Sequence, residues 1–410
     1  MNRLKDISTL VDGLSAGERI YLPGSAGEVP ALTAALLGEA APPLAITATL
    51  VPGINALPSE IRAGTTLSNP FAVAPAGWQA TGTFRHTALS YGGFNRALHN
   101  AEFDTCFIHV STPDAQGRVT LGPSVEFTPL AMKRARRIVA VINPLLPPIP
   151  GSVSIELSDI DSVVEMEASL RGYSAGGTGD QALRIAEGIA RFVEDGSTLQ
   201  VGLGKVPDAL LTTLRDRKKL RFHSGMLSDS FRHLLEAGAV DESVPAVSCV
   251  HVGSEDYYAW LAGRPGIAVS PVSHTHDPGR IASLPRFVAV NSALSVDLFG
   301  QANLEFAGAR AVSGVGGAAD FARGATLNPE GISIIGLPAL GPKAASRIVP
   351  ELAGVASLPR QDVDVVVTEF GTADLRGLSV RERGERLVEI AAPEHRSELS
   401  AAFADKVARF

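Results

Sequence analysis

The chain has 410 residues, of which 45% are hydrophobic and 19% are charged, and its formal net charge is −7. This composition is typical of a folded globular protein and excludes a disordered or fibrous chain, while the length favours two or three domains. Basic residues are scattered apart from the runs 133–137 and 215–219, which we interpret as solvated helix faces, so we expect no nucleic-acid partner. No apolar stretch approaches the roughly 20 residues of a membrane span, and the first residues lack an apolar signal core, so we expect a cytoplasmic protein without membrane contact.

Short β-branched runs alternate with amphipathic stretches along the chain. Strands are predicted at 44–50, 106–110, 138–142, 288–290, 332–335 and 363–368. Helices are predicted at 129–137, 180–194, 207–216 and 380–390, the first and third opening with proline. This alternation predicts an α/β fold with largely parallel sheets. Cys106 and Cys249 lie in apolar runs without metal-type spacing, so we expect reduced core residues in strands.

Two segments, 17–30 and 196–207, repeat one design, a strand followed by a glycine turn and a helix that begins with proline. Both end in Gly-x-Val-Pro, which predicts an internal duplication into two similar halves. The glycine-rich run 172–179 lies between them and is the expected linker. We therefore predict an N-terminal α/β domain over residues 1–175 and a C-terminal α/β domain over residues 180–410.

Two glycine-rich loops are candidates for ligand binding. Gly202 and Gly204 lie at the turn between a predicted strand and a predicted helix, where backbone amides and the positive helix end approach one spot. Such a pair alone is often only tight-turn geometry. The second loop carries Gly314, Gly316 and Gly317, and its N–H groups are of the kind that bind a thioester oxyanion or a pantetheine chain.

Four segments occur in a characteristic order: 201–210, then 221–229 (Arg-Phe-His-Ser-Gly-Met-Leu-Ser-Asp), 291–301 and 313–321. In this order they resemble the acetyl-CoA hydrolase/transferase family of class I CoA-transferases, which holds 4-hydroxybutyrate and butyrate CoA-transferases. The resemblance runs nearly end to end. It implies two tandem α/β domains of the CoA-transferase type, with an active-site cleft between them, that act in acetate metabolism. It also implies an acyl-CoA and a small carboxylate as partners, coenzyme A as substrate or ligand rather than a permanently bound cofactor, and a homo-oligomer, dimer or tetramer.

One position departs from the family. A Glu in place of Gly225 attacks the acyl-CoA thioester in the family and becomes a glutamyl-CoA thioester, which passes CoA to a carboxylate. Glycine has no nucleophile, so this route is excluded here. Ala318 also stands where the family usually carries Gln.

We therefore expect CoA transfer to a carboxylate or acyl-CoA hydrolysis by another route, through an activated water, direct attack by a carboxylate, or a relocated acid. The alternative is a non-catalytic or repurposed CoA-ester-binding protein, such as a partner subunit, a sensor, or a hydratase or ring-opening enzyme. Sugar-phosphate isomerisation rests on fold analogy alone.

Three residues are candidates for catalysis. Glu126 matches an acidic position of the N-terminal half and is the first candidate for a replacement acid or base. Glu255, beside Asp256, stands where related sequences tend to carry basic residues, although a surface loop with incidental acids is the simpler interpretation. His223 matches the family's histidine beside the missing Glu, where it either transfers protons or orients the loop.

Four further residues are implied to orient the loops: Ser224, Asp229, Asn291 and Asp320. We expect Asp229 to accept backbone hydrogen bonds at the start of a following helix. The run 273–277, Ser-His-Thr-His-Asp, has two histidines at i and i+2 and does not complete a recognised metal site, so we predict no metal.

Overall fold

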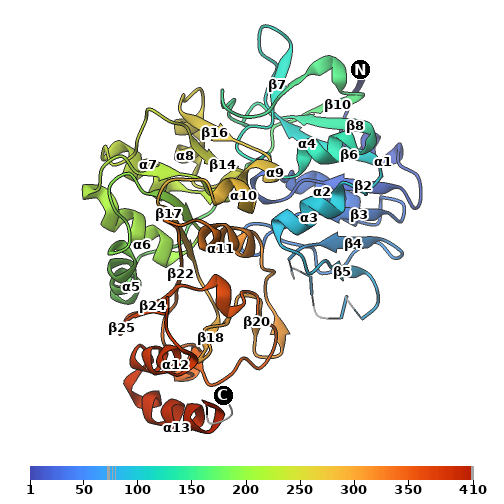
Figure 1. Ribbon diagram of the computed structural model, residues 1–410. Helices are drawn as coiled ribbons and strands as arrows, with labels where there is room; N and C mark the ends of the chain where they lie inside the picture. Colours follow the sequence, from blue (N-terminus) through green and yellow to red (C-terminus); the bar gives the residue numbers. More distant parts are fainter. Residues whose placement is uncertain (72–73, 76, 79, 408–410) are drawn as a thin grey trace. The chain divides into compact units, whose positions relative to one another are not determined.

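The computed structural model describes residues 1–71, 74–75, 77–78 and 80–407, and the chain forms two compact units (Figure 1). The first unit consists of residues 1–174 and 245–275, and the second consists of residues 175–244 and 276–410. Both are therefore discontinuous in sequence. The sequence-based division between 175 and 180 assigned residues 245–275 to the C-terminal domain, whereas the structure groups them with the N-terminal segment.

The first unit is built on an eight-stranded sheet with the order β1-β10-β8-β6-β2-β3-β4-β5, in which every neighbouring pair is parallel. Parallel strands need long crossovers, which accounts for the strand–helix alternation in the sequence. The strands are β1 (Asn2–Leu4), β2 (Arg19–Leu22), β3 (Ala45–Ala48), β4 (Thr66–Asn69), β5 (Phe84–His86), β6 (Phe103–Val110), β8 (Ala135–Ile142) and β10 (Ser162–Glu165). The helices of this segment are α1 (Ile7–Asp12), α2 (Pro30–Leu37), α3 (Tyr91–Leu98) and α4 (Thr128–Lys133).

Residues 245–275 complete the first unit. They form β14 (Ala246–Ser248), β15 (Val250–His251), α8 (Glu255–Leu261), β16 (Ile267–Val269) and α9 (Val272–Thr275). Backbone hydrogen bonds join them to the N-terminal segment: Val125 N–H donates to the Cys249 carbonyl at 3.0 Å, and Val269 N–H donates to the Gly151 carbonyl at 3.0 Å. The Tyr258 hydroxyl donates to the Arg171 carbonyl at 2.7 Å. The segment is thus part of the fold of this unit.

The second unit has a six-stranded sheet with the order β12-β11-β17-β22-β24-β25, parallel except for the β24–β25 pair. Its strands are β11 (Thr198–Val201), β12 (Arg221–Phe222), β17 (Phe287–Asn291), β22 (Ile332–Gly336), β24 (Val365–Thr368) and β25 (Gly371–Asp374). Its helices are α5 (Asp180–Ala190), α6 (Lys205–Thr213), α7 (Asp229–Glu236), α10 (Pro278–Ile281), α11 (Ala318–Leu327), α12 (Val380–Glu389) and α13 (Arg396–Val407). The residues of β17, β22 and β24 are buried throughout, as the central strands of a covered parallel sheet must be.

The predicted α/β fold class is confirmed, and strands β3, β6, β8, β17, β22 and β24 lie within or across the predicted apolar runs. The helix predicted at 129–137 is wrong at its end, because Ala135–Ile142 is a strand that pairs with β6. The helix predicted to start at Pro207 starts at Lys205, and Pro207 lies within its first turn, where a missing N–H costs no hydrogen bond. Cys249 is buried but lies between β14 and β15 rather than in a strand. None of the described helices is long and apolar enough to cross a membrane.

Candidate active site

Two loops and one strand end of the second unit belong to strands that are neighbours in its sheet. The loop Gly202–Gly204 follows β11, the segment His223–Gly225 follows β12, and Asn291 ends β17. Strand β11 pairs in parallel with both β12 and β17, so the residues after these three strands lie at one edge of the sheet. This is the edge at which open α/β sheets bind ligands.

The segment after β12 is fixed to β11 by hydrogen bonds. His223 N–H donates to the Leu199 carbonyl at 3.0 Å, and the Ser224 hydroxyl donates to the Val201 carbonyl at 2.8 Å. The side chains of His223 and Ser224 are buried, at 3% and 0% exposure. The backbone that presents Gly225 is therefore held on both sides of the strand end.

Asn291 is held by a partner that the sequence did not indicate. Its side-chain amide donates to the Gln200 Oε1 at 3.2 Å, and the Gln200 amide donates back to the Asn291 Oδ1 at 3.4 Å. Gln200 lies in β11 and is 3% exposed. This reciprocal amide pair ties the ends of β11 and β17 together, because buried amides are costly unless each finds a partner.

Glycine loops lead into two helix N-termini of the second unit. Gly204 has φ of 137° and is the N-cap of α6, while Gly316 has φ of 56° directly before Gly317, the N-cap of α11. Glycine adopts these φ values without steric cost. The first amides of a helix carry partial positive charge, so both loops present anion-attracting groups. Asp320 lies in the first turn of α11 and is 8% exposed.

Asp229 lies at the start of α7 rather than before it. It is the first helical residue, and Ser228 is the N-cap but makes no side-chain capping hydrogen bond. A carboxylate in the first turn is stabilised by the positive end of the helix.

His276 packs against Gly225. A β-carbon on Gly225 would lie 3.2 Å from the His276 Nε2 and 3.4 Å from the Phe321 Cε2. A β-carbon on Gly317 would lie only 2.2 Å from the same nitrogen. The imidazole stacks obliquely on Phe321, with ring centroids 4.6 Å apart, and is 2% exposed. From the sequence, this histidine was considered only as part of an incomplete metal cluster, and no local pattern connects it to Gly225.

Burial is the main cause that lowers the pKa of His276 to about 3, and the charge of the nearby His223 acts in the same direction. The imidazole of His276 is therefore neutral at physiological pH. A neutral imidazole has one N–H donor and one lone pair, so it hydrogen-bonds without carrying charge into the interior.

Glu126 lies inside the first unit, at 2% exposure. The Tyr91 hydroxyl donates to its Oε1 at 3.0 Å and the Thr49 hydroxyl donates to its Oε2 at 3.2 Å. Burial raises the pKa of Glu126 to about 7, although these hydroxyl groups oppose the change. Its φ of 39° is unusual for a residue with a side chain and stores backbone strain. The group has the protonation behaviour of an acid or base near neutral pH.

Glu255 and Asp256 are exposed in the first turn of α8, in the first unit. The helix is capped by Ser254, whose hydroxyl accepts a hydrogen bond from the Tyr257 N–H at 3.2 Å. Acids at this position stabilise a helix through its dipole. The arrangement is that of a surface helix start.

A second buried carboxylate of the first unit was missed from the sequence. Glu28 has 0% exposure, and its Oε2 accepts hydrogen bonds from the Arg171 Nε at 2.6 Å and the Asn55 Nδ2 at 2.5 Å. Glu28 lies within the repeated Gly-x-Val-Pro motif, between β2 and α2, beside Ser25, which has φ of 51°. Because Arg171 and Asn55 lie far away in sequence, no local pattern could indicate the cluster.

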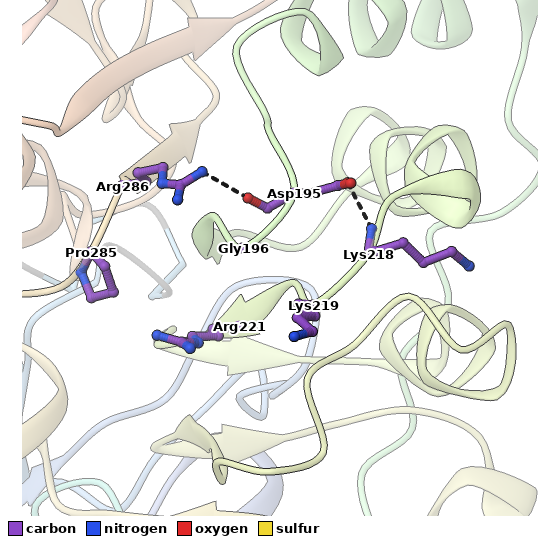
Figure 2. A pocket seen from close by; sticks show the side chains of 7 residues that line it. All are labelled: Asp195, Gly196, Lys218, Lys219, Arg221, Pro285 and Arg286. Atoms are coloured by element: carbon purple, nitrogen blue, oxygen red, sulfur yellow. Dashed lines mark hydrogen bonds between the residues drawn. The ribbon is translucent and has the colours of Figure 1, made fainter.

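A basic pocket of about 430 Å³ lies at the other end of the strands of the second unit (Figure 2). It is lined by Asp195, Gly196, Lys218, Lys219, Arg221, Pro285 and Arg286. Gly196 precedes β11, Arg221 begins β12 and Arg286 precedes β17, so the pocket is at the amino ends of these strands. Arg286 Nη1 donates to the Asp195 carbonyl at 3.0 Å, and Arg221 pairs with Asp241 at 3.1 Å. The pocket is separate from the edge that carries Gly225.

Among the described residues, no group of three His, Cys, Asp or Glu could hold a metal ion.

Glycine loops and helix N-termini in a unit with a largely parallel sheet are typical of α/β proteins that bind ligands at the carboxyl ends of their strands. The N-terminal domain of acetyl-CoA hydrolase/transferase matches residues 84–170, and the C-terminal domain of acetyl-CoA hydrolase/transferase matches residues 253–403. The 4-hydroxybutyrate coenzyme A transferase of Clostridium kluyveri is 34% identical over 351 residues, which cover 78% of this chain and 82% of that protein. The chain belongs to the acetyl-CoA hydrolase/transferase family, which confirms the resemblance.

Two further comparisons agree with this assignment. The acetyl-CoA hydrolase of Kluyveromyces lactis is 27% identical over 353 residues, which cover 74% of this chain and 66% of that protein. The crystal structure of RipA from Yersinia pestis superimposes with a TM-score of 0.92 at 28% identity, covering 100% of this chain and 98% of that one. The similarity therefore extends over the whole chain, including both units.

Proposed function

We propose that this chain is an enzyme that cleaves acyl-CoA thioesters without a covalent glutamyl-CoA intermediate, with hydrolysis as the leading reaction. The observation that carries the proposal is Gly225, which has no side chain although hydrogen bonds of His223 and Ser224 fix the two residues before it to β11. The family relatives support the substrate class, since they include an acetyl-CoA hydrolase and a CoA-transferase. A binding protein without catalysis has no chemical need for this buried, ordered segment.

In the proposed reaction, the oxygen of a water molecule bonds to the thioester carbonyl carbon and the C–S bond breaks. The proton released by the water ends on the sulfur, so acyl-CoA and water give a carboxylic acid and coenzyme A. Amides of the Gly202–Gly204 and Gly314–Gly317 loops stabilise the developing oxyanion. If a small carboxylate attacks in place of water, the same site transfers CoA through a free mixed anhydride, which the released thiolate then attacks at the other carbonyl.

The experiment combines thiol release with intact-protein mass spectrometry. Purified protein is mixed with a panel of acyl-CoA thioesters, with and without acetate, and free coenzyme A is measured together with the protein mass after borohydride or hydroxylamine treatment. We expect release of coenzyme A and no protein-bound CoA. A CoA adduct on Glu126, Glu255 or another acid would overturn the non-covalent route, and binding without any release would establish the CoA-ester-binding alternative.

Further features belong to the same proposal. Coenzyme A acts as substrate or product and not as a resident cofactor, a small carboxylate is the product or acceptor, and no metal takes part. Glu126, with its pKa near 7, is the proposed acid or base of the first unit, and Glu255 is a second candidate.

The family resemblance supports a cytoplasmic homo-oligomer, either a dimer or a tetramer. Sedimentation analysis of the purified chain tests self-association, and substitution of each Glu by Gln tests its role.

A further inference from the structure

The His276 imidazole lies against two glycines. The φ of Gly317 is −86°, and Gly225 has no left-handed φ, so neither backbone conformation requires glycine. At 317 the ring itself leaves no room for a side chain, because a β-carbon there would lie 2.2 Å from the His276 Nε2. At 225 the space is tight, because a β-carbon there would lie 3.2 Å from the same nitrogen.

The direction of the missing side chain is also informative. The nearest atom to a β-carbon on Gly225 is the His276 Nε2, and the His276 Cε1 is 3.5 Å away. A glutamate at 225 would extend three more bonds from that β-carbon, so its side chain would begin directly beside the imidazole. Gly225 and Gly317 are both half-buried, and the ring lies against both of them.

We propose that His276 replaces the missing glutamate, and that its neutral imidazole donates a hydrogen bond to the carbonyl oxygen of the bound thioester. This proposal rests on the proposed function for its substrate. It assigns a new catalytic residue to the second unit and explains how a site that lost its nucleophile keeps a polar group at the same place. The attack and the C–S cleavage are those described above, and His276 gains or loses no proton overall.

Two properties of the surroundings suit a neutral donor. The Nε2 lies against Gly317, the N-cap of α11, where the positive helix end opposes a second positive charge. The ring is buried between Phe321 and the glycines, which also disfavours the charged form. A neutral imidazole beside a helix N-terminus polarises a carbonyl in other enzymes, where keeping the ring uncharged is part of the mechanism.

The competing interpretation is that the ring only fills space. To separate the two, we compare His276→Gln, which keeps an N–H donor, with His276→Phe, which keeps an aromatic ring, and His276→Ala, which keeps neither. His233→Gln on the exposed side of α7 is the matched control. We expect kcat for thioester cleavage to fall about 100-fold or more in the Phe and Ala variants, with KM little changed, and less than about tenfold in the Gln variant. A Phe variant with kcat within about threefold of the unchanged protein, or equal losses in Gln and Ala, would overturn the proposal.

A second experiment tests whether the His276 ring occupies the place of a glutamate side chain at 225. It does not depend on thioester cleavage by the unchanged protein. Gly225→Glu is made alone and together with His276→Ala, and both proteins are exposed to acyl-CoA and examined for protein-bound CoA by mass spectrometry. We expect the glutamyl-CoA adduct in the double variant and at least about tenfold less in the single variant. Equal amounts of adduct in both variants, or no adduct in the folded double variant, would contradict the placement of His276 where the glutamate would lie. If the unchanged protein cleaves no thioester while this pattern holds, the proposed function fails and the placement of His276 stands.

Discussion

The α-carbon of Gly317 faces the His276 imidazole so closely that a β-carbon there would lie 2.2 Å from Nε2 and 2.4 Å from Cδ2. Gly317→Ala must therefore displace the ring or the N-terminus of α11. We expect the free energy of unfolding to fall by about 1–3 kcal/mol, the usual cost of overpacking, measured by urea denaturation. Gly202→Ala is the control, since a β-carbon at 202 meets no atom within 4 Å. The prediction fails if both variants are equally stable, and His276→Ala should restore the stability of Gly317→Ala.

Glu126→Gln is predicted to change how stability depends on pH. The folded-state pKa of Glu126 is raised from 4.5 to about 7, so the protonated group stabilises the fold below pH 4.5 and this contribution is lost as pH rises through about 7. The neighbouring Tyr21, Tyr91 and Cys249 all have raised pKa values, so they stay neutral in this range. Between pH 5 and pH 8 the unchanged protein should lose roughly 1–3 kcal/mol relative to Glu126→Gln, measured by urea unfolding at both pH values. Parallel pH profiles of the two proteins would contradict the raised pKa.

The Gln200–Asn291 pair is predicted to couple energetically. Each amide donates to the other at 3.2–3.4 Å in a buried place, so removing one leaves the other without that partner. In a double-mutant cycle of Gln200→Leu and Asn291→Leu, we expect each single change to cost about 1–3 kcal/mol and the pair to cost less than the sum. Additive losses would show that the amides act independently.

Arg171→Met is predicted to destabilise the first unit by removing the cation that neutralises Glu28. Breaking a buried ion pair from one side costs about 3 kcal/mol or more, because the carboxylate stays buried. Arg386→Met is the control, since Arg386 and Glu389 are both more than half exposed and such pairs contribute about 0.5 kcal/mol. Calorimetric unfolding of both variants measures the difference, and equal losses would contradict the prediction.

The buried strands of the fold could be predicted from the local sequence pattern. The β-branched runs of β17, β22 and β24 are buried on both faces, and such strands are visible as continuous apolar stretches. The run Ala135–Arg137 was predicted as the end of a helix that opens with proline, but pairing with β6 makes it a strand. Tertiary pairing outweighs propensity at such positions.

The candidate site could be predicted only in part. Gly202, Gly225 and Gly317 could be selected as candidates because each lies in a recognisable loop motif. His276 and Gln200 could not, since they were singled out by contacts with residues in other segments. The same holds for Glu28, because its partner Arg171 lies 143 residues away in the sequence. Relations of this kind are set by the packing of distant elements, which a single sequence does not display.

The interleaved course of the chain has a consequence for biosynthesis. The first unit includes residues 245–275, and Cys249 and Val269 bond to backbone groups of the N-terminal segment. A ribosome must therefore synthesise residues 175–244 before the first unit can be completed, although these residues belong to the second unit. During that interval the partners of β14–β16 in the nascent N-terminal segment are without them, so the first unit cannot be completed until part of the second unit has been synthesised.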